Sequence, residues 1–248
     1  MRALLRLTWL EIKIFVREPM GVIGTLGIPV VVFIVLARLL GPRYRAGSSD
    51  IPRFVSADLP IFAAMLIAAS AVLSLIAIVA IYREGGILKR LRATPLQPHT
   101  ILSAHVLVKL LFTAVTMALM ILAGRRYYPV GADVPLASFT LALVLSTASI
   151  VSMGFLIASV VPTARFAQPI GTLVVYPMLG LSGLFVPIEA LPPAAQAIAR
   201  VLPFTYAVSL LRGIWHGEGW IRHAGDVFML ALISAALLAI ATRVFRWE

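Results

Sequence analysis

LPIFAAMLIAASAVLSLIAIVAIY at residues 59–82, followed directly by REGGILKRLRATPL at residues 83–96, is the stretch that decides the fold. The first part holds no charged residue. A helix rises about 1.5 Å per residue, so about 20 apolar residues cross a hydrocarbon core of about 30 Å. The second part is short, basic and compatible with a helix. We therefore expect a membrane-spanning helix that leads into a basic connector, which a soluble partner can contact.

Five further apolar segments are long enough to span a bilayer: Met20–Leu40, Ala104–Gly124, Pro135–Val161, Ala167–Val186 and Asp226–Thr242. Pro169 and Pro177 interrupt the fifth span, but membrane helices tolerate proline where neighbours satisfy the backbone. Hydrophobic residues make up 61% of the chain and charged residues 12%. A soluble domain is about half apolar and about a quarter charged. The sequence therefore predicts an all-α membrane protein with six transmembrane helices in a single domain, residues 1–248.

The chain has a formal net charge of +11 and no cysteine. Because the basic residues cluster beside apolar segments, they indicate membrane topology and contact with anionic lipid head groups rather than nucleic acid. The lack of cysteine excludes a disulfide scaffold, a thiolate metal site and a cysteine nucleophile. The four histidines are scattered without metal-ligand spacing, so we expect no metal site.

The first nineteen residues have the pattern of an amphipathic helix. At about 100° per residue, the basic side chains fall in one narrow arc; they are Arg2, Arg6, Lys13 and Arg17. Pro19 then breaks the helix before the first span. We expect a helix over residues 1–19 that lies in the membrane interface. The alternative is an ordinary basic segment that flanks the first span.

Basic residues also orient the predicted spans. If the N-terminus is cytoplasmic, the inner segments hold a modest excess of Lys and Arg over the outer loops. The compact cluster Arg83–Arg92 then lies in a short inner loop, where the positive-inside rule applies most strongly. We therefore expect a multi-pass protein of the plasma membrane with both termini in the cytoplasm.

The outer segment of residues 187–225 is long but not polar. Its prolines forbid one continuous helix; they are Pro187, Pro192, Pro193 and Pro203. Phe204–Trp215 is mostly apolar and compatible with a helix. The segment is too apolar for an ordinary loop and too broken for an ordinary span, so we expect a re-entrant helical hairpin between spans five and six.

Enzymatic motifs are mostly absent. The chain has no G-x-x-x-x-G-K-[ST] phosphate loop, so a different chain must hydrolyse any ATP that drives this protein. Gly180-Leu181-Ser182-Gly183 matches the G-x-S-G of rhomboid intramembrane proteases. A serine nucleophile needs a base within hydrogen-bond reach, and the last predicted span has no histidine. We expect no catalytic residue here and a packing role for the small residues.

Two basic residues lie within predicted spans. Lys109 lies in the third span and Arg38 lies near the end of the first, and we expect both to snorkel toward head groups. No Asp or Glu lies in the middle of a span. This argues against a carrier coupled to protons or sodium, which needs a carboxylate at depth.

The connector and the outer hairpin resemble the membrane subunits of type-2 ATP-binding-cassette (ABC) exporters. The pattern E-x-G-x-L-x-x-L-x-x-T-P-L after the second span is matched by Glu84, Gly86, Leu88, Leu91, Thr94, Pro95 and Leu96. Ile87 stands where threonine is common in that family. The proline-punctuated hairpin is matched by an S-G-x-x-x-P stretch and later Leu-Pro and Leu-Arg-Gly steps, which contain Gly183, Pro187, Pro192, Pro203 and Arg212.

This resemblance covers the whole chain and implies a mechanism. Two permease subunits would face each other, and each would dock on a separate ABC ATPase subunit through residues 83–98. The chain itself would bind no cofactor, since ATP and Mg would lie on the ATPase. The cargo would be amphipathic or apolar: a drug, a lipid or a lipid-linked glycan. Two alternatives stay open, namely a solvated positive-inside loop at the connector and a non-transport protein such as an intramembrane protease or an assembly factor.

Overall fold

The computed structural model describes residues 2–17, 19–28, 59–86, 98–127, 136–161 and 163–244, with a few further residues between 30 and 38. In these ranges the chain is helical and holds no strand. The elements in chain order are α1 (Arg2–Arg17), α2 (Pro19–Val22), the π-helix η1 (Ile23–Gly27), α5 (Leu59–Glu84), α7 (Pro98–Tyr127), α8 (Leu136–Val160), α9 (Ala164–Gly180), the 3-10 helix η2 (Ile188–Ala190), α10 (Pro193–Ala199), α11 (Pro203–Trp215) and α12 (Ala224–Val244).

Three of the described helices are long and apolar enough to cross a membrane: α5 over Ala64–Glu84, α8 over Ala137–Val160 and α12 over Ala224–Ala241. The pair α10 and α11, which is bent by 80°, would make a fourth if it formed one span. The predicted all-α membrane fold is therefore confirmed. The count of six spans and the re-entrant nature of the hairpin stay predictions.

The first, third and fifth predicted spans are not among these candidates, and the structure describes each of them to a different extent. The start of Met20–Leu40 is described as most of α2 and the whole of η1, whereas beyond residue 28 the structure describes only a few helical residues up to 38. The third, Ala104–Gly124, falls entirely within α7, which has 30 residues and is apolar over Val106–Leu119. The fifth corresponds to α9, which has 17 residues and contains Pro169 and Pro177. At about 1.5 Å per residue, a helix of that length is somewhat shorter than a typical hydrocarbon core.

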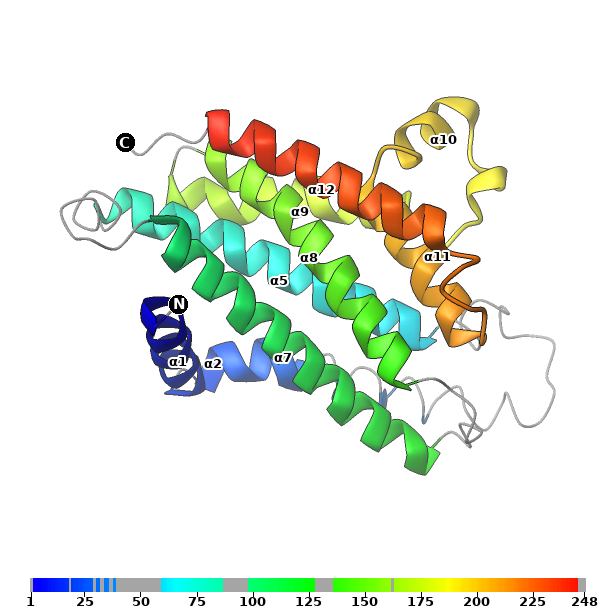
Figure 1. Ribbon diagram of the computed structural model, residues 1–248, viewed down its shortest axis with the longest axis horizontal. Coiled ribbons are helices and arrows are strands. Elements are labelled where there is room, and N and C mark those ends of the chain that lie inside the picture. The colour runs from blue at the N-terminus through cyan, green and yellow to red at the C-terminus, as the bar shows by residue number, and fades with distance from the viewer. Residues whose placement is uncertain are drawn as a thin grey trace.

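The long helices run along one common direction, and α5 lies at their centre (Figure 1). It packs against α8 and α9, while α8 also packs against α11 and α12. At one end of the bundle lie the last turn of α5, the start of α7, the α8–α9 turn and the last turn of α12; we call this the connector end. At the opposite end lie α10, α11 and the turn before α12; we call this the hairpin end (Figure 1).

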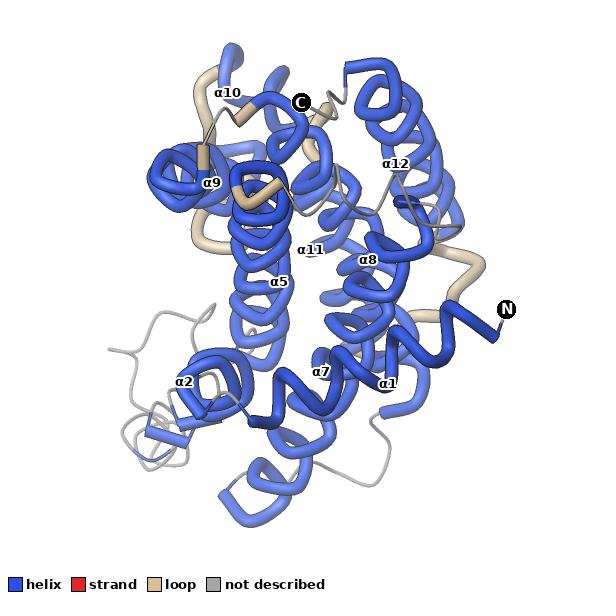
Figure 2. The backbone as a smooth tube through the Cα atoms, turned by 90° about the vertical axis from the view of Figure 1, so that its left-hand side faces the viewer, coloured by secondary structure: helices blue, strands red, loops and turns tan. Residues whose placement is uncertain are grey.

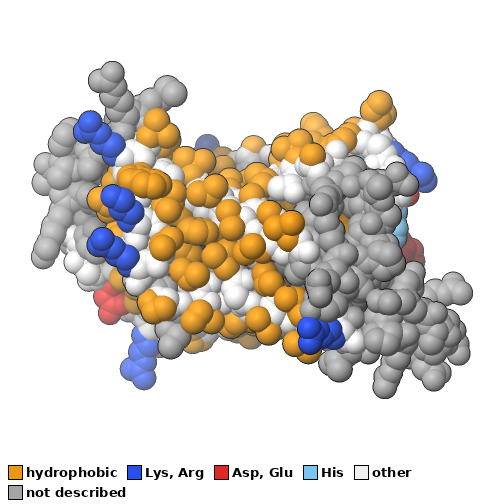
Figure 3. Space-filling model, turned by 90° about the horizontal axis from the view of Figure 1, so that it is seen from below, with side chains coloured by type: hydrophobic (Ala, Val, Ile, Leu, Met, Phe, Trp, Pro, Cys, Tyr) orange, Lys and Arg blue, Asp and Glu red, His pale blue; other side chains and the backbone are white. Residues whose placement is uncertain are grey.

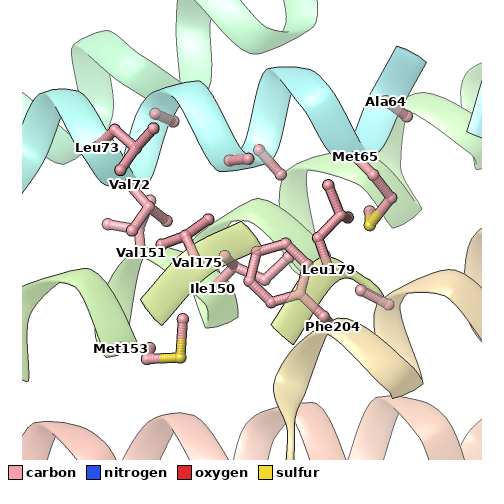
Figure 4. Close-up of a cluster of buried hydrophobic side chains, with 14 of the residues drawn as sticks. Ala64, Met65, Val72, Leu73, Ile150, Val151, Met153, Val175, Leu179 and Phe204 are labelled. Atoms are coloured by element: carbon pink, nitrogen blue, oxygen red, sulfur yellow. The ribbon is translucent and has the colours of Figure 1, made fainter. Parts of the chain in front are cut away.

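The central helix α5 is apolar on all sides, which is typical of a helix buried by its neighbours. Its side chains meet those of α8, α9 and α11 in the main apolar cluster (Figure 4). Two glycines let the neighbouring helices approach closely. A Cβ added at Gly154 of α8 would lie 2.9 Å from Cγ1 of Val72, and one added at Gly171 of α9 would lie 3.0 Å from Cδ2 of Leu73. Close packing of this kind stabilises membrane helices in place of a hydrophobic driving force.

The N-terminal helix α1 crosses the connector end at a steep angle to the long helices (Figure 2). It exposes large apolar side chains, which include Leu5, Trp9 and Leu10. On its other side, the Phe15 ring packs on the Phe112 ring of α7 with centroids 4.3 Å apart. The predicted helix over residues 1–19 is thus present to Arg17, and its place in the membrane interface stays a prediction.

The prediction that Lys109 snorkels to head groups is wrong. Its side chain is 5% exposed, and Nζ lies 4.8 Å from the centroid of the Phe15 ring. The physical reason is that α1 covers this part of α7 and offers the ammonium an aromatic face, which attracts a cation.

One face of the molecule carries a broad apolar band, with Lys and Arg side chains toward its two ends (Figure 3). Apolar surface between charged ends is what a bilayer requires of a spanning protein. The arrangement agrees with the membrane fold that composition predicts.

We predict that Gly154→Ala lowers the stability of the purified protein by about 1–3 kcal/mol, the range for an overpacked core. The added methyl group would press on Val72, so the double variant with Val72→Ala should recover much of the loss. The measurement is thermal unfolding in detergent. Gly180→Ala is the matched control, because a Cβ there meets no atom within 4 Å. Equal melting temperatures for the two alanine variants would contradict the tight contact.

Candidate functional site at the connector end

The helix α5 ends where the sequence predicts, at the paired glycines. Gly85 N donates to Ile81 O at 2.9 Å, and Gly86 N donates to Arg83 O at 3.1 Å. Gly86 has φ +64°, a left-handed conformation that suits glycine and terminates helices. The helix therefore terminates at Gly86, the last described residue before the remainder of the connector. The other predicted docking residues lie outside the described part of the chain; they are Leu88, Leu91, Thr94 and Pro95.

Arg83, in the last turn of α5, reaches across to the end of α8. Nη1 donates to Val161 O at 2.7 Å, and Nη2 donates to Ala158 O at 2.9 Å and to Ser159 O at 3.4 Å. The last carbonyls of a helix have no partner within the helix and carry the negative end of its dipole. A guanidinium satisfies both needs, and a hydrogen bond from a charged group contributes about 1.5–3 kcal/mol.

Glu84, the next residue, reaches the start of α9. The backbone N–H of Ala164 donates to Glu84 Oε2 at 2.8 Å. Thr163, the residue at the N-cap position of α9, makes no capping bond with its own side chain. The carboxylate of Glu84 therefore takes the capping role from another helix, at the end of α9 where a negative charge is favoured.

Arg83 and Glu84 thus hold both sides of the α8–α9 turn, and we call these two residues and their backbone partners the clamp. Each charge faces the helix end that its sign stabilises. The sequence pattern predicts a role for Arg83 in topology and a contact with an ATPase for Glu84, and it does not predict the clamp. The signal that it missed is the pair of adjacent opposite charges at the end of a long uncharged span.

The helix α1 also contacts the connector end. Tyr82 Oη donates a long hydrogen bond of 3.4 Å to Glu11 Oε1. Further along α1, Lys13 Nζ lies 5.5 Å from the Trp9 ring. The last turn of α5 therefore has contacts with α1, α8 and α9, which makes it the place where these helices meet.

At the hairpin end, the structure brings together two residues that the sequence analysis selected. Arg212 Nη2 donates to Gly183 O at 3.3 Å, and Gly183 has φ +83°. The selected prolines each lie at the start of a helix: Pro187 precedes η2, Pro192 precedes α10, and Pro203 is the first residue of α11. Proline suits these positions because the first N–H groups of a helix lack helical partners.

Side chains also close the bend between α10 and α11. Thr205 Oγ1 donates to Ala199 O at 2.6 Å, and Tyr206 Oη donates to Arg200 O at 2.6 Å. These bonds satisfy carbonyls at the end of α10 from the first turn of α11. The bend of 80° is therefore held by side chains as well as by the backbone.

A polar cluster joins α11 to α12. His223 Nδ1 lies 2.8 Å from Asp226 Oδ2, and His223 Nε2 lies 3.0 Å from Glu218 Oε2. Ser209 Oγ donates to the same Asp226 oxygen at 2.8 Å. The imidazole fills the space beside Gly213, where an added Cβ would lie 1.8 Å from Nε2. The sequence analysis read His223 as ordinary polarity near a span and missed this cluster.

The described residues contain no group of three or more His, Cys, Asp or Glu side chains that could hold a metal ion. The Ser182 hydroxyl, which the sequence analysis compared with a protease nucleophile, is 1% exposed and donates to Leu179 O at 2.6 Å. That bond satisfies a carbonyl in the last turn of α9, in agreement with the packing role that we expect for Ser182.

Comparison with known proteins agrees with this architecture. The family model described as ABC-2 type transporter matches residues 2–215. The inner membrane transport permease YhhJ of Escherichia coli K12 is 30% identical over 172 residues, which cover 66% of this chain and 44% of that protein. Nodulation protein J of Rhizobium meliloti is 29% identical over 103 residues, 39% of each chain.

A second nodulation protein J, from Rhizobium leguminosarum bv. viciae, is 36% identical over 67 residues, which cover 27% of this chain and 26% of that protein. The matched regions thus span less than half the length of these relatives. The family match is far broader than any of these pairwise matches, since it extends from the start of α1 to the end of α11. The resemblance seen in the connector and the hairpin is thereby confirmed, and the chain belongs to the ABC-2 type transporter family.

Proposed function

We propose that this chain is the permease subunit of an ATP-driven ABC exporter, which moves an amphipathic or apolar cargo out of the cytoplasm. Membership of a family of transport permeases and the apolar helices give the coarse function, an integral membrane permease. The observation that carries the finer proposal is the clamp. It binds the end of α5, where the connector begins, to the turn between α8 and α9. A segment that docks on a soluble ATPase needs such a firm attachment to the membrane helices.

The proposed partner at the connector is a separate ABC ATPase subunit, which would bind ATP and Mg. Leu88 and Leu91 offer apolar side chains for a groove, while Lys89, Arg90 and Arg92 offer charge for a cytosolic surface. A second permease subunit, identical or homologous, would complete the pathway, and lipids would cover the remaining apolar surface.

The proposed cargo class follows from the chemistry inside the helix bundle. The buried polar side chains of α8 are hydroxyls, the buried ammonium of Lys109 in α7 faces the Phe15 ring, and the described spans hold no carboxylate at mid-depth. A small ion would require charged or carbonyl-lined sites. A drug, a lipid or a lipid-linked glycan requires mostly apolar surface, so these cargoes suit the bundle better.

The proposed location is the plasma membrane, with both termini in the cytoplasm. The first turn of α1 and the last turn of α12 lie toward the connector end (Figure 1). A connector that meets a cytosolic ATPase would place that end inside. The basic residues of α1 and of the connector agree with this orientation.

We predict that single cysteines at Leu88 and Leu91 crosslink to a co-expressed ABC ATPase when they carry a photoreactive thiol reagent. The natural chain has no cysteine, so each variant reacts at one site. Ile221→Cys is the control, because Ile221 is 93% exposed and lies in the turn between α11 and α12. Crosslinking no stronger at the connector than at Ile221 would refute docking through this segment.

We predict that Ser182→Ala retains transport within about twofold, because a hydroxyl that caps a carbonyl contributes little net free energy. The measurement is ATP-dependent cargo efflux from cells or vesicles with matched expression. If the variant were fully assembled yet inactive, the intramembrane protease alternative would become the better reading.

We predict that a label at Ala197 in α10 reacts from outside the cell and a label at Trp247 reacts from inside. Ala197 is exposed, and a hairpin that dips into the bilayer without crossing it leaves the C-terminus cytoplasmic. Membrane-impermeant thiol reagents on intact and opened cells provide the measurement. Two labels that react from the same side would show that α10 and α11 cross the membrane, and labels on opposite but exchanged sides would show the inverted orientation.

A further inference from the structure

We propose that Arg83 and Glu84 are positioning residues through which movement of the connector reaches the α8–α9 turn and, from there, α9. This inference rests on the proposed function, because it assumes that an ATPase moves the connector. It assigns to the clamp a transmitting role that a simple cap for two helix ends does not have.

The first step is the place of the clamp in the chain. Arg83 and Glu84 are the last two residues of α5, and the left-handed Gly86 follows two residues after Glu84. A displacement of the connector therefore acts on these two residues before it acts on any other part of α5.

The second step is the way in which the two side chains divide their contacts. Arg83 binds three carbonyls at the end of α8, and Glu84 binds the first N–H of α9. A guanidinium is a rigid planar fork, so its orientation is fixed by several bonds at once. A shift of the α5 end would therefore displace the end of α8 through Arg83 and the start of α9 through Glu84. These two helix ends lie on either side of a turn of three residues.

The third step is the attachment of α9 to the bundle. Its buried residues recur along one face, which packs on α5; they are Ala167, Gly171, Val175 and Leu179. The opposite face is open, and Leu173 there is 75% exposed. Because α9 has few contacts with α8 beyond the turn, α9 can follow the end of α5 without unpacking the α8 core. The clamp adds to this packing at the connector end, where it ties the first residue of α9 to the last turn of α5.

The test uses the permease together with its ATPase subunit in lipid nanodiscs. An environment-sensitive fluorophore is attached to a single cysteine, either at Gln168, which is exposed in the second turn of α9, or at Lys89 in the connector. In the unaltered background, ATP should change both signals. Arg83→Gln and Glu84→Gln should each reduce the ATP response at Gln168 by about tenfold. The reason is that each substitution weakens a charge-assisted hydrogen bond, and the loss of one such bond changes an equilibrium constant by about tenfold. For Arg83→Gln, whose contacts are with the end of α8, the response at Lys89 and the rate of ATP hydrolysis should stay within about twofold of the unaltered protein.

Matched controls are Glu189→Gln and Arg200→Gln, two exposed residues at the hairpin end, which should leave both responses unchanged. The exchange variant R83E/E84R tests the physical basis. It places each charge at the wrong helix end, so it should be no better than the single variants. Recovery of the α9 response in the exchange variant would show that the residues act as a simple ion pair and would overturn the assignment.

Three further outcomes are decisive. An unchanged ATP response at Gln168 in both single variants would overturn the inference while the proposed function stands. Loss of both responses together with poor assembly would show that the clamp serves folding alone, which also overturns it. If ATP changes neither signal in the unaltered protein, docking of the connector is refuted, and the proposed function fails with the inference.

Discussion

Backbone groups at helix ends need partners, because the last carbonyls and the first N–H groups of a helix have none within it. At the α8–α9 turn, the last carbonyls of α8 and the first N–H of α9 both have this need within a few residues. The structure meets it with side chains from α5, Arg83 for the carbonyls and Glu84 for the N–H. The exit of the connector, the turn and the central helix are therefore bound into one unit.

The hairpin end meets the same need mostly with local side chains, although Arg212 also reaches Gly183 O from 29 residues away. Thr205 and Tyr206 close the bend from the next helix in the chain, and His223 is held by carboxylates three and five residues away. The clamp instead joins residues about 80 apart in the sequence. A network of near neighbours stabilises its own segment, whereas a contact between distant segments makes the position of one depend on the other. The contacts at the hairpin end are thus suited to stabilising the hairpin, and the clamp is suited to coupling the position of α5 to that of the α8–α9 turn.

The features that the sequence predicts correctly are those set by the local composition of a segment. The uncharged run of α5 and the break at Gly85-Gly86 are local properties, and both follow from composition and backbone chemistry. The sequence predictions failed where a partner comes from elsewhere in the chain. Lys109 is buried because α1, nearly a hundred residues earlier, lies over it with Phe15. The capping bonds of Arg83 likewise depend on helices whose ends no periodicity locates to within a residue.

The contact of Glu84 with α9 does not compete with the predicted contact with an ATPase. A carboxylate has two oxygens and accepts about four hydrogen bonds, and the observed bond to Ala164 uses Oε2. Glu84 is also exposed, so a cytosolic partner can reach it. One side chain can therefore fix the start of α9 and meet a docked subunit at the same time. If Glu84 makes both contacts, binding of the ATPase would act on the same side chain that holds the start of α9. The effect of docking would then reach α9 without passing through another helix.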